Sequence, residues 1–243
     1  MPPFEVLLPL GAIGLYLLDS ALLMYSNELL FLRHRRQWDF AEGSQLILLG
    51  RRVYLPNPLT PNVPLFRIRW SEHDSRERRE QPDEILRFAA VLRPVQYFVL
   101  GLLLLLLALP VELLWFGTGL ALLALFAAFY MVVFASLGYI YVRRRELRVS
   151  GKAFLWLSFD SLACAPFAIN LVRKLSMRGS LAGNPIGFAK QTFNTETFAR
   201  LVRHLCSHVE GEQQREEKQT PRWYELDAFR RELVEMLQCQ SSK

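Results

Sequence analysis

The sequence predicts an α-helical polytopic membrane protein with three transmembrane helices, an interfacial or re-entrant segment, and small mixed α/β cytoplasmic portions. The first observation is the distribution of charge. The chain has 243 residues and 29 Lys or Arg, yet residues 1–32 and 94–142 contain neither. The second is that these two stretches hold the long apolar runs, and about 20 apolar residues in a helix span the ~30 Å hydrocarbon core. The third is the arginines that flank each run.

The first predicted span lies in residues 1–32. Its apolar run extends from Val6 to Tyr25 with Asp19 inside it, and the pattern allows the helix to continue through Leu29–Leu32. Twenty residues at a rise of 1.5 Å reach about 30 Å, which is enough to cross a bilayer.

The second and third spans are predicted to form a helical hairpin in residues 94–142. The runs Val95–Trp115 and Leu120–Tyr141 are separated only by Phe116–Gly119, which includes a Gly-Thr-Gly sequence typical of a turn. This loop is therefore expected to be short and exposed.

The positions of the basic residues predict the orientation. Positive charge concentrates on the cytoplasmic side of membrane spans, and the same side is indicated at every predicted crossing. The N-terminus is therefore expected outside and the C-terminus inside, and the short outer loops favour a bacterial inner membrane. The flanking residues are Arg33, Arg35 and Arg36 after the first span, Arg87 and Arg93 before the second, and Arg143, Arg144, Arg145 and Arg148 after the third.

Residues 153–172 are apolar but are not expected to cross the bilayer. Polar residues recur through the segment, and basic residues lie at both ends, where a crossing would place them on opposite sides. A segment that lies in the interface, or enters the bilayer and returns, fits this pattern best. A fourth span and a soluble core helix are the alternatives.

The cytoplasmic segment 33–93 is predicted to contain short strands around a rigid loop. Gln45–Leu49, Val53–Leu55 and Leu65–Trp70 have the composition of strands, and four prolines hold residues 56–64 in extended or turn conformations.

The cytoplasmic C-terminal region, residues 143–243, is predicted to end in two amphipathic helices. Apolar residues recur at intervals of three and four in Thr195–Val209 and Pro221–Leu237, and Thr220 is placed to cap the second helix. Both helices have an apolar face to bury, so we expect them to pack on each other, on the strands or on another protein.

Asp19 is the candidate site residue within a span. A carboxylate inside a membrane is costly unless it is neutral, paired or hydrated. Because the three spans contain no Lys or Arg, the sequence indicates that an intramembrane cation would come from another protein or from solvent. Asp19 is therefore a candidate partner contact or proton site, and Asp19→Leu is expected to weaken partner association without loss of abundance. An interfacial position for Asp19 is the alternative.

Four basic residues are candidates for binding anionic lipid headgroups. Arg173, Lys174, Arg178 and Lys190 surround a Gly/Asn/Pro-rich loop at residues 178–190, whose glycine spacing matches no phosphate-binding fingerprint. An ordinary solvent loop is the alternative.

Two other constellations are weak. His204 and His208 lie four residues apart on a predicted helix but lack clear further ligands, so no metal site and no cofactor are predicted. Asp160, Cys164 and Asn170 could form a nucleophilic group, but an apolar environment disfavours a thiolate.

These observations favour a non-enzymatic membrane anchor or assembly subunit that presents a cytoplasmic platform to a larger partner complex. Membrane spans explain the positive charge, so nucleic acid is not an expected partner; the bilayer and another protein are. A small lipid-handling enzyme or transporter using Asp19, Asp160 or the 178–190 loop is the alternative.

Overall fold

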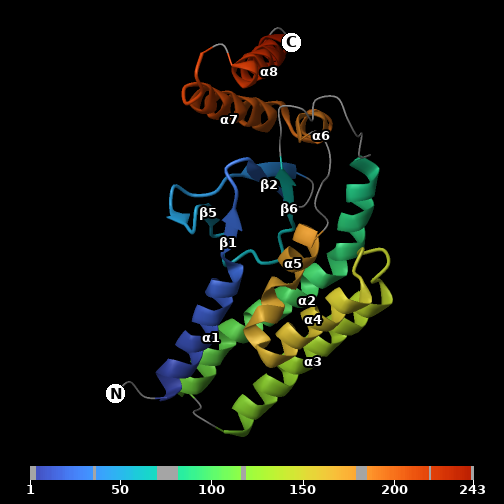
Figure 1. The fold of residues 1–243 in the computed structure, drawn as a ribbon. Coiled ribbons are helices and arrows are strands. Elements are labelled where there is room, and N and C mark those ends of the chain that lie inside the picture. The colour runs from blue at the N-terminus through green and yellow to red at the C-terminus, as the bar shows by residue number, and fades with distance from the viewer. Residues whose placement is uncertain are drawn as a thin grey trace. The chain divides into compact units, whose positions relative to one another are not determined.

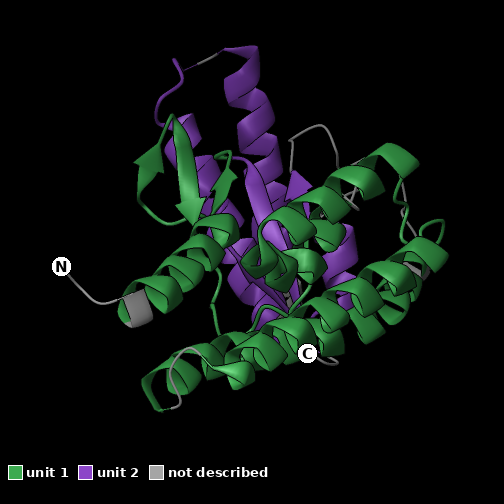
Figure 2. Cartoon of the chain, turned by 90° about the horizontal axis from the view of Figure 1, so that it is seen from below, with its two compact units in different colours: residues 1–26, 43–66, 83–180 green, residues 27–42, 67–82, 181–243 purple. Residues whose placement is uncertain are grey.

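The computed structural model describes residues 4–34, 37–69, 82–115, 119–178, 185–218 and 220–241. The chain forms two compact units, each built from three separate segments (Figure 2). The four consecutive regions expected from the sequence stay a prediction. Unit 1 comprises residues 1–26, 43–66 and 83–180, and unit 2 comprises residues 27–42, 67–82 and 181–243.

Two long helices of unit 1 form the predicted hairpin. Helix α2 covers Pro82–Trp115 and helix α3 covers Leu120–Val142 (Figure 1). Both are long and apolar enough to cross a membrane, which confirms this part of the prediction by length and composition. Only 33% and 22% of their most apolar windows are buried, whereas the core helix of a soluble protein would be mostly buried.

The first helix is shorter than predicted. Helix α1 covers Phe4–Ser20, and its 17 residues reach about 25 Å. The predicted extension to Tyr25 and through Leu29–Leu32 is wrong, because strand β1 (Leu22–Met24) and strand β2 (Glu28–His34) occupy those residues. Short apolar runs fit a strand as well as a helix, and here pairing with other strands decides between them. Three spans are therefore not confirmed.

The strands predicted in the segment 33–93 are present, although β4 is shorter than expected. Strand β5 (Arg51–Tyr54) pairs antiparallel with β1 on one side and with β4 (Ile47–Leu48) on the other. Strand β6 covers Leu65–Arg69. The proline-rich loop before β6 turns at Asn57, whose side-chain Oδ1 accepts a hydrogen bond from the Leu59 backbone N–H at 2.9 Å.

The segment after α3 folds back as a second helical hairpin, which we call the α4–α5 hairpin (Gly151–Arg178). It consists of helix α4 (Gly151–Ala163), the 3₁₀ helix η1 (Ala165–Asn170) and helix α5 (Leu171–Arg178). The predicted segment 153–172 thus contains a break instead of one continuous helix.

Contacts along α3 define the direction of α4. The Tyr141 and Phe154 rings lie 5.3 Å apart at the start of α4, and the Tyr130 hydroxyl donates to the Leu162 carbonyl at 3.4 Å near its end. Helix α4 therefore runs antiparallel to α3 for about 16 Å, the length of eleven helical residues (Figure 1). Helix α5 returns, because Arg178 Nη1 donates to the Ala153 carbonyl at 3.1 Å.

Unit 2 combines a small sheet with three helices. The sheet has the order β3-β2-β6, where β3 covers Gln37–Ala41 and the first two residues of β6 belong to unit 1. Helix α6 (Pro185–Thr192) and the turn after it supply Phe188 and Phe193, whose rings lie 5.7 and 4.8 Å from that of Phe31 in β2. These aromatic contacts bury the strand that the sequence pattern had suggested as helix.

Both predicted amphipathic helices are confirmed. Helix α7 covers Thr195–Gln213 and helix α8 covers Pro221–Ser241, and the two pack on each other. The Thr220 hydroxyl caps α8 by accepting a hydrogen bond from the Trp223 N–H at 3.2 Å. Of the predicted 178–190 loop, residues 179–184 lie outside the described residues.

Candidate functional site

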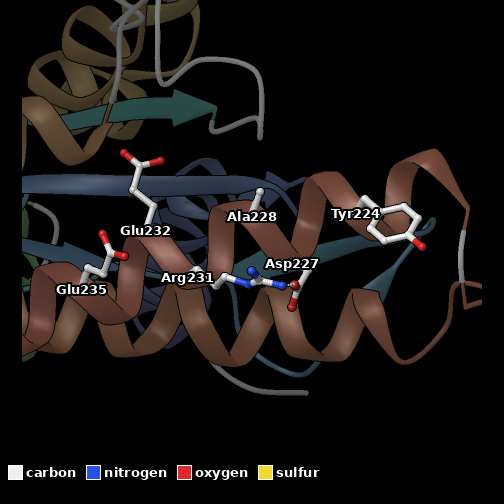
Figure 3. A pocket seen from close by; sticks show the side chains of 6 residues that line it. All are labelled: Tyr224, Asp227, Ala228, Arg231, Glu232 and Glu235. Atoms are coloured by element: carbon white, nitrogen blue, oxygen red, sulfur yellow. Dashed lines mark hydrogen bonds and ion pairs between the residues drawn. The ribbon is translucent and has the colours of Figure 1, made fainter.

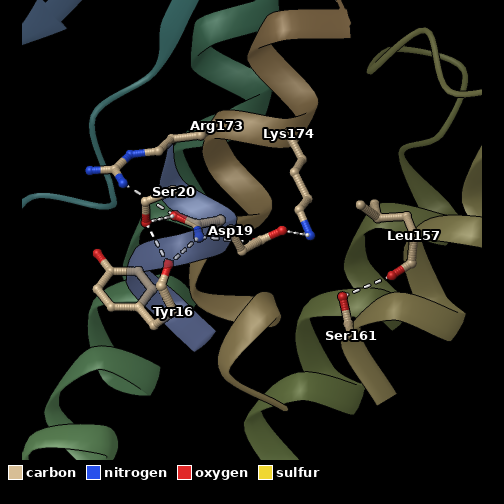
Figure 4. Close-up of polar contacts among 8 residues, drawn as sticks. Tyr16, Asp19, Ser20, Leu157, Ser161, Arg173 and Lys174 are labelled. Atoms are coloured by element: carbon tan, nitrogen blue, oxygen red, sulfur yellow. Dashed lines mark hydrogen bonds and ion pairs between the residues drawn. The ribbon is translucent and has the colours of Figure 1, made fainter. Parts of the chain in front are cut away.

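Polar side chains gather where the end of α1 meets η1 and α5 (Figure 4). Asp19 lies in the last turn of α1, and its Oδ1 is 3.0 Å from Lys174 Nζ of α5. Its other oxygen, Oδ2, accepts a hydrogen bond from Asn170 Nδ2 at 3.0 Å. Both carboxylate oxygens are therefore engaged within unit 1. We call this group the Asp19 cluster; it consists of Tyr16, Asp19, Ser20, Asn170, Arg173 and Lys174.

The cation beside Asp19 comes from this chain. The side chains of Asp19 and Lys174 are 16% and 18% exposed, so the ion pair is largely removed from solvent. The sequence had indicated another protein or solvent as the source of an intramembrane cation. That inference is wrong because Lys174 lies outside the three predicted spans and reaches Asp19 from α5. The Lys174 ammonium also lies 4.9 Å from the centre of the Phe167 ring, a cation–π contact.

Asn170 is the centre of the cluster. Its Nδ2 donates to Asp19 and to the Tyr16 carbonyl at 3.4 Å, while its Oδ1 lies 3.1 Å from the Ser20 hydroxyl. Arg173 Nη1 donates to the same Oδ1 at 3.2 Å. An amide offers two donors and one carbonyl oxygen with two acceptor positions, so the side chain uses its full hydrogen-bonding capacity here.

Arg173 ties the cluster to the proline-rich loop. Its side chain is among the largest fully buried ones, with 2% of the residue exposed. Arg173 Nη2 donates to the Asn57 carbonyl at 2.7 Å and to the Thr60 carbonyl at 3.2 Å. The Tyr16 hydroxyl donates to the Pro58 carbonyl of the same loop at 2.5 Å. Two side chains thus hold three carbonyl groups of one turn.

The Asp19 cluster has the chemistry of a structural polar network, in which hydrogen bonds and an ion pair link separate elements, and not that of a reaction centre. Each polar side chain of the Asp19 cluster is bonded to another member or to the loop, and its hydroxyls contact carbonyl and amide oxygens instead of a general base. Hydrogen-bonded buried polar groups favour one packing arrangement over others, although Arg173 Nε has no hydrogen-bond partner among the described residues. The cluster therefore joins α1, the α4–α5 hairpin and the loop into one unit.

The four predicted lipid-binding residues belong to different units and differ in exposure. Arg173 and Lys174 are engaged inside unit 1, Arg178 is exposed at the end of α5, and Lys190 is exposed on α6 of unit 2. Headgroup binding by these residues stays a prediction.

The weak nucleophilic constellation of Asp160, Cys164 and Asn170 is divided by the break between α4 and η1. Asp160 lies on α4, where its backbone carbonyl accepts from the Cys164 N–H, and Asn170 is engaged with the Asp19 cluster. Cys164 and Cys206 are free cysteines, and burial raises the pKa of the Cys206 thiol. A raised pKa disfavours a thiolate nucleophile at Cys206.

No group of three or more His, Cys, Asp or Glu side chains is placed to hold a metal ion in the part of the chain that the structure describes. The His204 and His208 rings lie 6.5 Å apart, and each contacts a carboxylate: His204 Nδ1 is 3.3 Å from Glu42 Oε2, and His208 Nδ1 is 3.8 Å from Glu212 Oε1.

Sequence reasoning missed Tyr16 and Ser20, although a signal for them exists. Tyr16, Asp19 and Ser20 are spaced by three and four residues, so they lie on one face of α1. A polar face on an otherwise apolar helix indicates a polar partner. The proline-rich loop was noted as rigid, but nothing local to it indicates Arg173.

Unit 2 carries a shallow hollow on the surface of α8 (Figure 3), lined by Tyr224, Asp227, Ala228, Arg231, Glu232 and Glu235. The hydrogen bond from Arg231, more than any other contact, lowers the pKa of Asp227. Asp227 thereby stays charged, and it holds Arg231 and Arg230 on the helix surface.

The structure thus defines a mostly helical protein. Two helices of unit 1 could span a membrane, and the same unit contains the largely buried Asp19 cluster. The chain matches no family model, no curated protein and no solved structure.

Proposed function

We propose that this protein is a non-enzymatic integral membrane anchor or assembly subunit, in which unit 1 lies in the bilayer and unit 2 is a platform for a larger partner complex. One observation carries the proposal: the division of exposed apolar side chains between the units. Among the described side chains, the exposed large hydrophobic residues of unit 2 are Tyr224 and Val234, and all others belong to unit 1.

The exposed residues of unit 1 lie on its apolar helices. Leu104 is 61% exposed on α2, Met131 is 67% exposed on α3, and Leu155 is 69% exposed on α4. Water-soluble surfaces rarely carry apolar patches of this extent, whereas hydrocarbon solvates them without cost. The same chain buries Leu92, Val133 and Leu157 on these helices, so each helix has one face toward protein and one toward lipid.

The α4–α5 hairpin is proposed to re-enter the bilayer. It begins beside the end of α3 and returns there, and its tip lies level with the middle of α3. Basic residues at both ends, Lys152 and Arg178, then stay on the same side of the membrane, as positive flanks require. Within a bilayer such a break is tolerated where protein satisfies the backbone, and η1 packs against both α1 and α4.

The proposed orientation places unit 2 in the cytoplasm of a bacterial cell and the α2–α3 loop outside. The arginine-rich turn after α3 and the exposed Arg87 and Arg93 at the start of α2 then share the inner side. The Asp19 cluster supports an anchor over a transporter or enzyme, because its side chains are engaged with one another.

Cysteine accessibility tests the orientation and the re-entrant hairpin together. In a cysteine-free background, a cysteine replacing Gly119 should react with an impermeant maleimide on intact cells. Cysteines replacing Lys152 and Ser207 should react only after the membrane is opened. These two positions bracket the α4–α5 hairpin, so labelling of one and not the other would establish a crossing there and contradict the re-entrant proposal.

Substitutions on α8 test whether unit 2 binds a partner complex. Tyr224→Arg with Val234→Glu should reduce recovery of the co-purifying partner complex at least tenfold, because an interface loses most affinity when exposed apolar anchors become charged. The matched control is Ser207→Arg with Gln214→Glu, which introduces the same two charges at exposed positions of α7 and its C-terminal end. Partner recovery is measured by quantitative mass spectrometry after mild detergent extraction. Equal recovery from both variants and the native chain would contradict a platform centred on α8.

A further inference from the structure

The β4–β5 hairpin of unit 1 carries a strongly apolar tip. Leu46, Ile47, Leu48 and Leu49 are consecutive, and they are 66%, 67%, 54% and 87% exposed. In a sheet with one face on a core, alternate residues would be buried. Here both faces of the strand are apolar and exposed, so the tip is built to meet an apolar environment outside the described chain.

The backbone of the turn between β4 and β5 is unusual for a leucine. Strands β4 and β5 pair with Leu48 opposite Arg51, and Leu49 and Gly50 form the two-residue turn with φ angles of +53° and +72°. A two-residue turn with positive φ at both positions favours Asn-Gly or Gly-Gly. A leucine there is strained. The tip therefore carries a residue that neither the turn geometry nor any packing within the described chain explains.

Charge next to the tip identifies the environment. Arg51 and Arg52 follow the turn directly, and the Arg51 guanidinium lies 4.4 Å from the centre of the exposed Tyr25 ring and donates to its hydroxyl at 2.6 Å. Tyrosine and arginine beside an apolar tip are the residues that favour the boundary between acyl chains and anionic headgroups.

The hairpin is tied to the apolar helices by β1. Residue Leu22 pairs with Tyr54 of β5, and only Ala21 separates β1 from the end of α1. The tip thus belongs to the unit that exposes its leucines along α1, α2 and α3.

We propose that the β4–β5 hairpin inserts its tip, Leu46–Leu49, into the headgroup–acyl boundary of the bilayer, with Arg51 and Arg52 at the anionic headgroups. This inference rests on the proposed membrane function and adds a second point of lipid contact to it. The hairpin then sets the height of β1 and of the end of α1 relative to the bilayer surface.

An environment-sensitive fluorophore tests the insertion in the full chain. Single cysteines replace Leu49, Leu123 on the exposed face of α3, or Ser207 on α7, with Cys164, Cys206 and Cys239 removed. The labelled proteins are reconstituted into vesicles of phosphatidylcholine and phosphatidylglycerol. At position 49 we expect a blue-shifted emission that nitroxide-bearing lipid quenches at least twofold more than aqueous iodide does, with position 123 as the lipid control and position 207 as the aqueous control.

The quenching results distinguish failure of the hairpin insertion from failure of the membrane-anchor proposal. Iodide quenching at position 49 with lipid quenching at position 123 would overturn the hairpin insertion and leave the membrane anchor standing. Iodide quenching at position 123 would overturn both. Shielding of position 49 from lipid and iodide alike would show a protein contact and overturn the insertion.

A second variant separates a specific tip from general proximity to lipid. With the label at position 49, Ile47→Ser with Leu48→Ser should lower lipid quenching at least twofold. Leu59→Ser, which changes a leucine that is 65% exposed in the proline-rich loop, should leave it unchanged. Lipid quenching should also be stronger with phosphatidylglycerol than with phosphatidylcholine alone. An equal response of both serine variants, or no dependence on the anionic lipid, would contradict the assigned roles of the leucines and arginines.

Discussion

The variant Asp19→Leu is expected to destabilise unit 1. It removes the counterion from Lys174 and one acceptor from Asn170 Nδ2, and the lysine keeps its contact with the Phe167 ring. Exposed ion pairs contribute up to about 1 kcal/mol, and breaking a fully buried one costs about 3–5 kcal/mol. Because Asp19 and Lys174 are mostly but not fully buried, we expect a loss of about 2–3 kcal/mol.

This expectation replaces the one drawn from sequence, in which Asp19→Leu leaves abundance intact. Thermal unfolding followed by tryptophan fluorescence in detergent should show a decrease of roughly 5–10 °C. The double variant Asp19→Leu with Lys174→Met should recover most of the loss, because it removes both charges of the pair. Glu146→Leu is the matched control, since it breaks the exposed Arg143–Glu146 pair and should change stability by less than about 0.5 kcal/mol.

The outcome shows whether Asp19 stabilises unit 1 internally or contacts a partner protein. An unchanged unfolding temperature for Asp19→Leu, together with loss of a co-purifying protein, would restore the partner-contact hypothesis. A double variant less stable than either single variant would contradict the pairing of Asp19 with Lys174.

The helices that the sequence predicts correctly are those specified by residues close together in the chain. Leu102–Leu107 and the apolar run after Gly119 predict α2 and α3, because a span is specified by about 20 neighbouring residues. The amphipathic period of α7 and the cap at Thr220 are equally local, and both are confirmed. The break at Cys164 has a local signal too, since Pro166 lies in the first turn of η1.

The parts that sequence reasoning missed depend on distant residues. Leu22–Met24 becomes a strand because Arg52–Tyr54 pairs with it, and Phe31 is buried by Phe188 and Phe193. Asn170 and Asp19 are 151 positions apart. Arg173 and Lys174 looked like surface charges beside a glycine-rich loop because their partners lie on α1 and in the proline-rich loop.

Replacing Arg173 with methionine is expected to have the largest effect on the proline-rich loop. The change keeps an unbranched side chain in the buried position but removes the charge and the donors to Asn57 O, Thr60 O and Asn170 Oδ1. Leaving buried acceptors unpaired costs about 1–3 kcal/mol each before relaxation, so we expect a total loss of about 3–5 kcal/mol. Lysine at this position should recover only part of it, because a single ammonium cannot match the spread of the guanidinium donors.

Hydrogen–deuterium exchange shows where in the chain Arg173→Met lowers amide protection. In Arg173→Met the amides of Thr60, Val63 and Leu65, which are bonded in or beside the loop, should exchange at least tenfold faster. Helices α7 and α8 of unit 2 should be unchanged. The control Arg178→Met removes one exposed hydrogen bond to Ala153 and should leave the loop protected. If Arg173→Met and Arg178→Met exchange alike at residues 57–65, Arg173 does not hold this loop, and the polar network reduces to the Asp19–Lys174–Asn170 contacts.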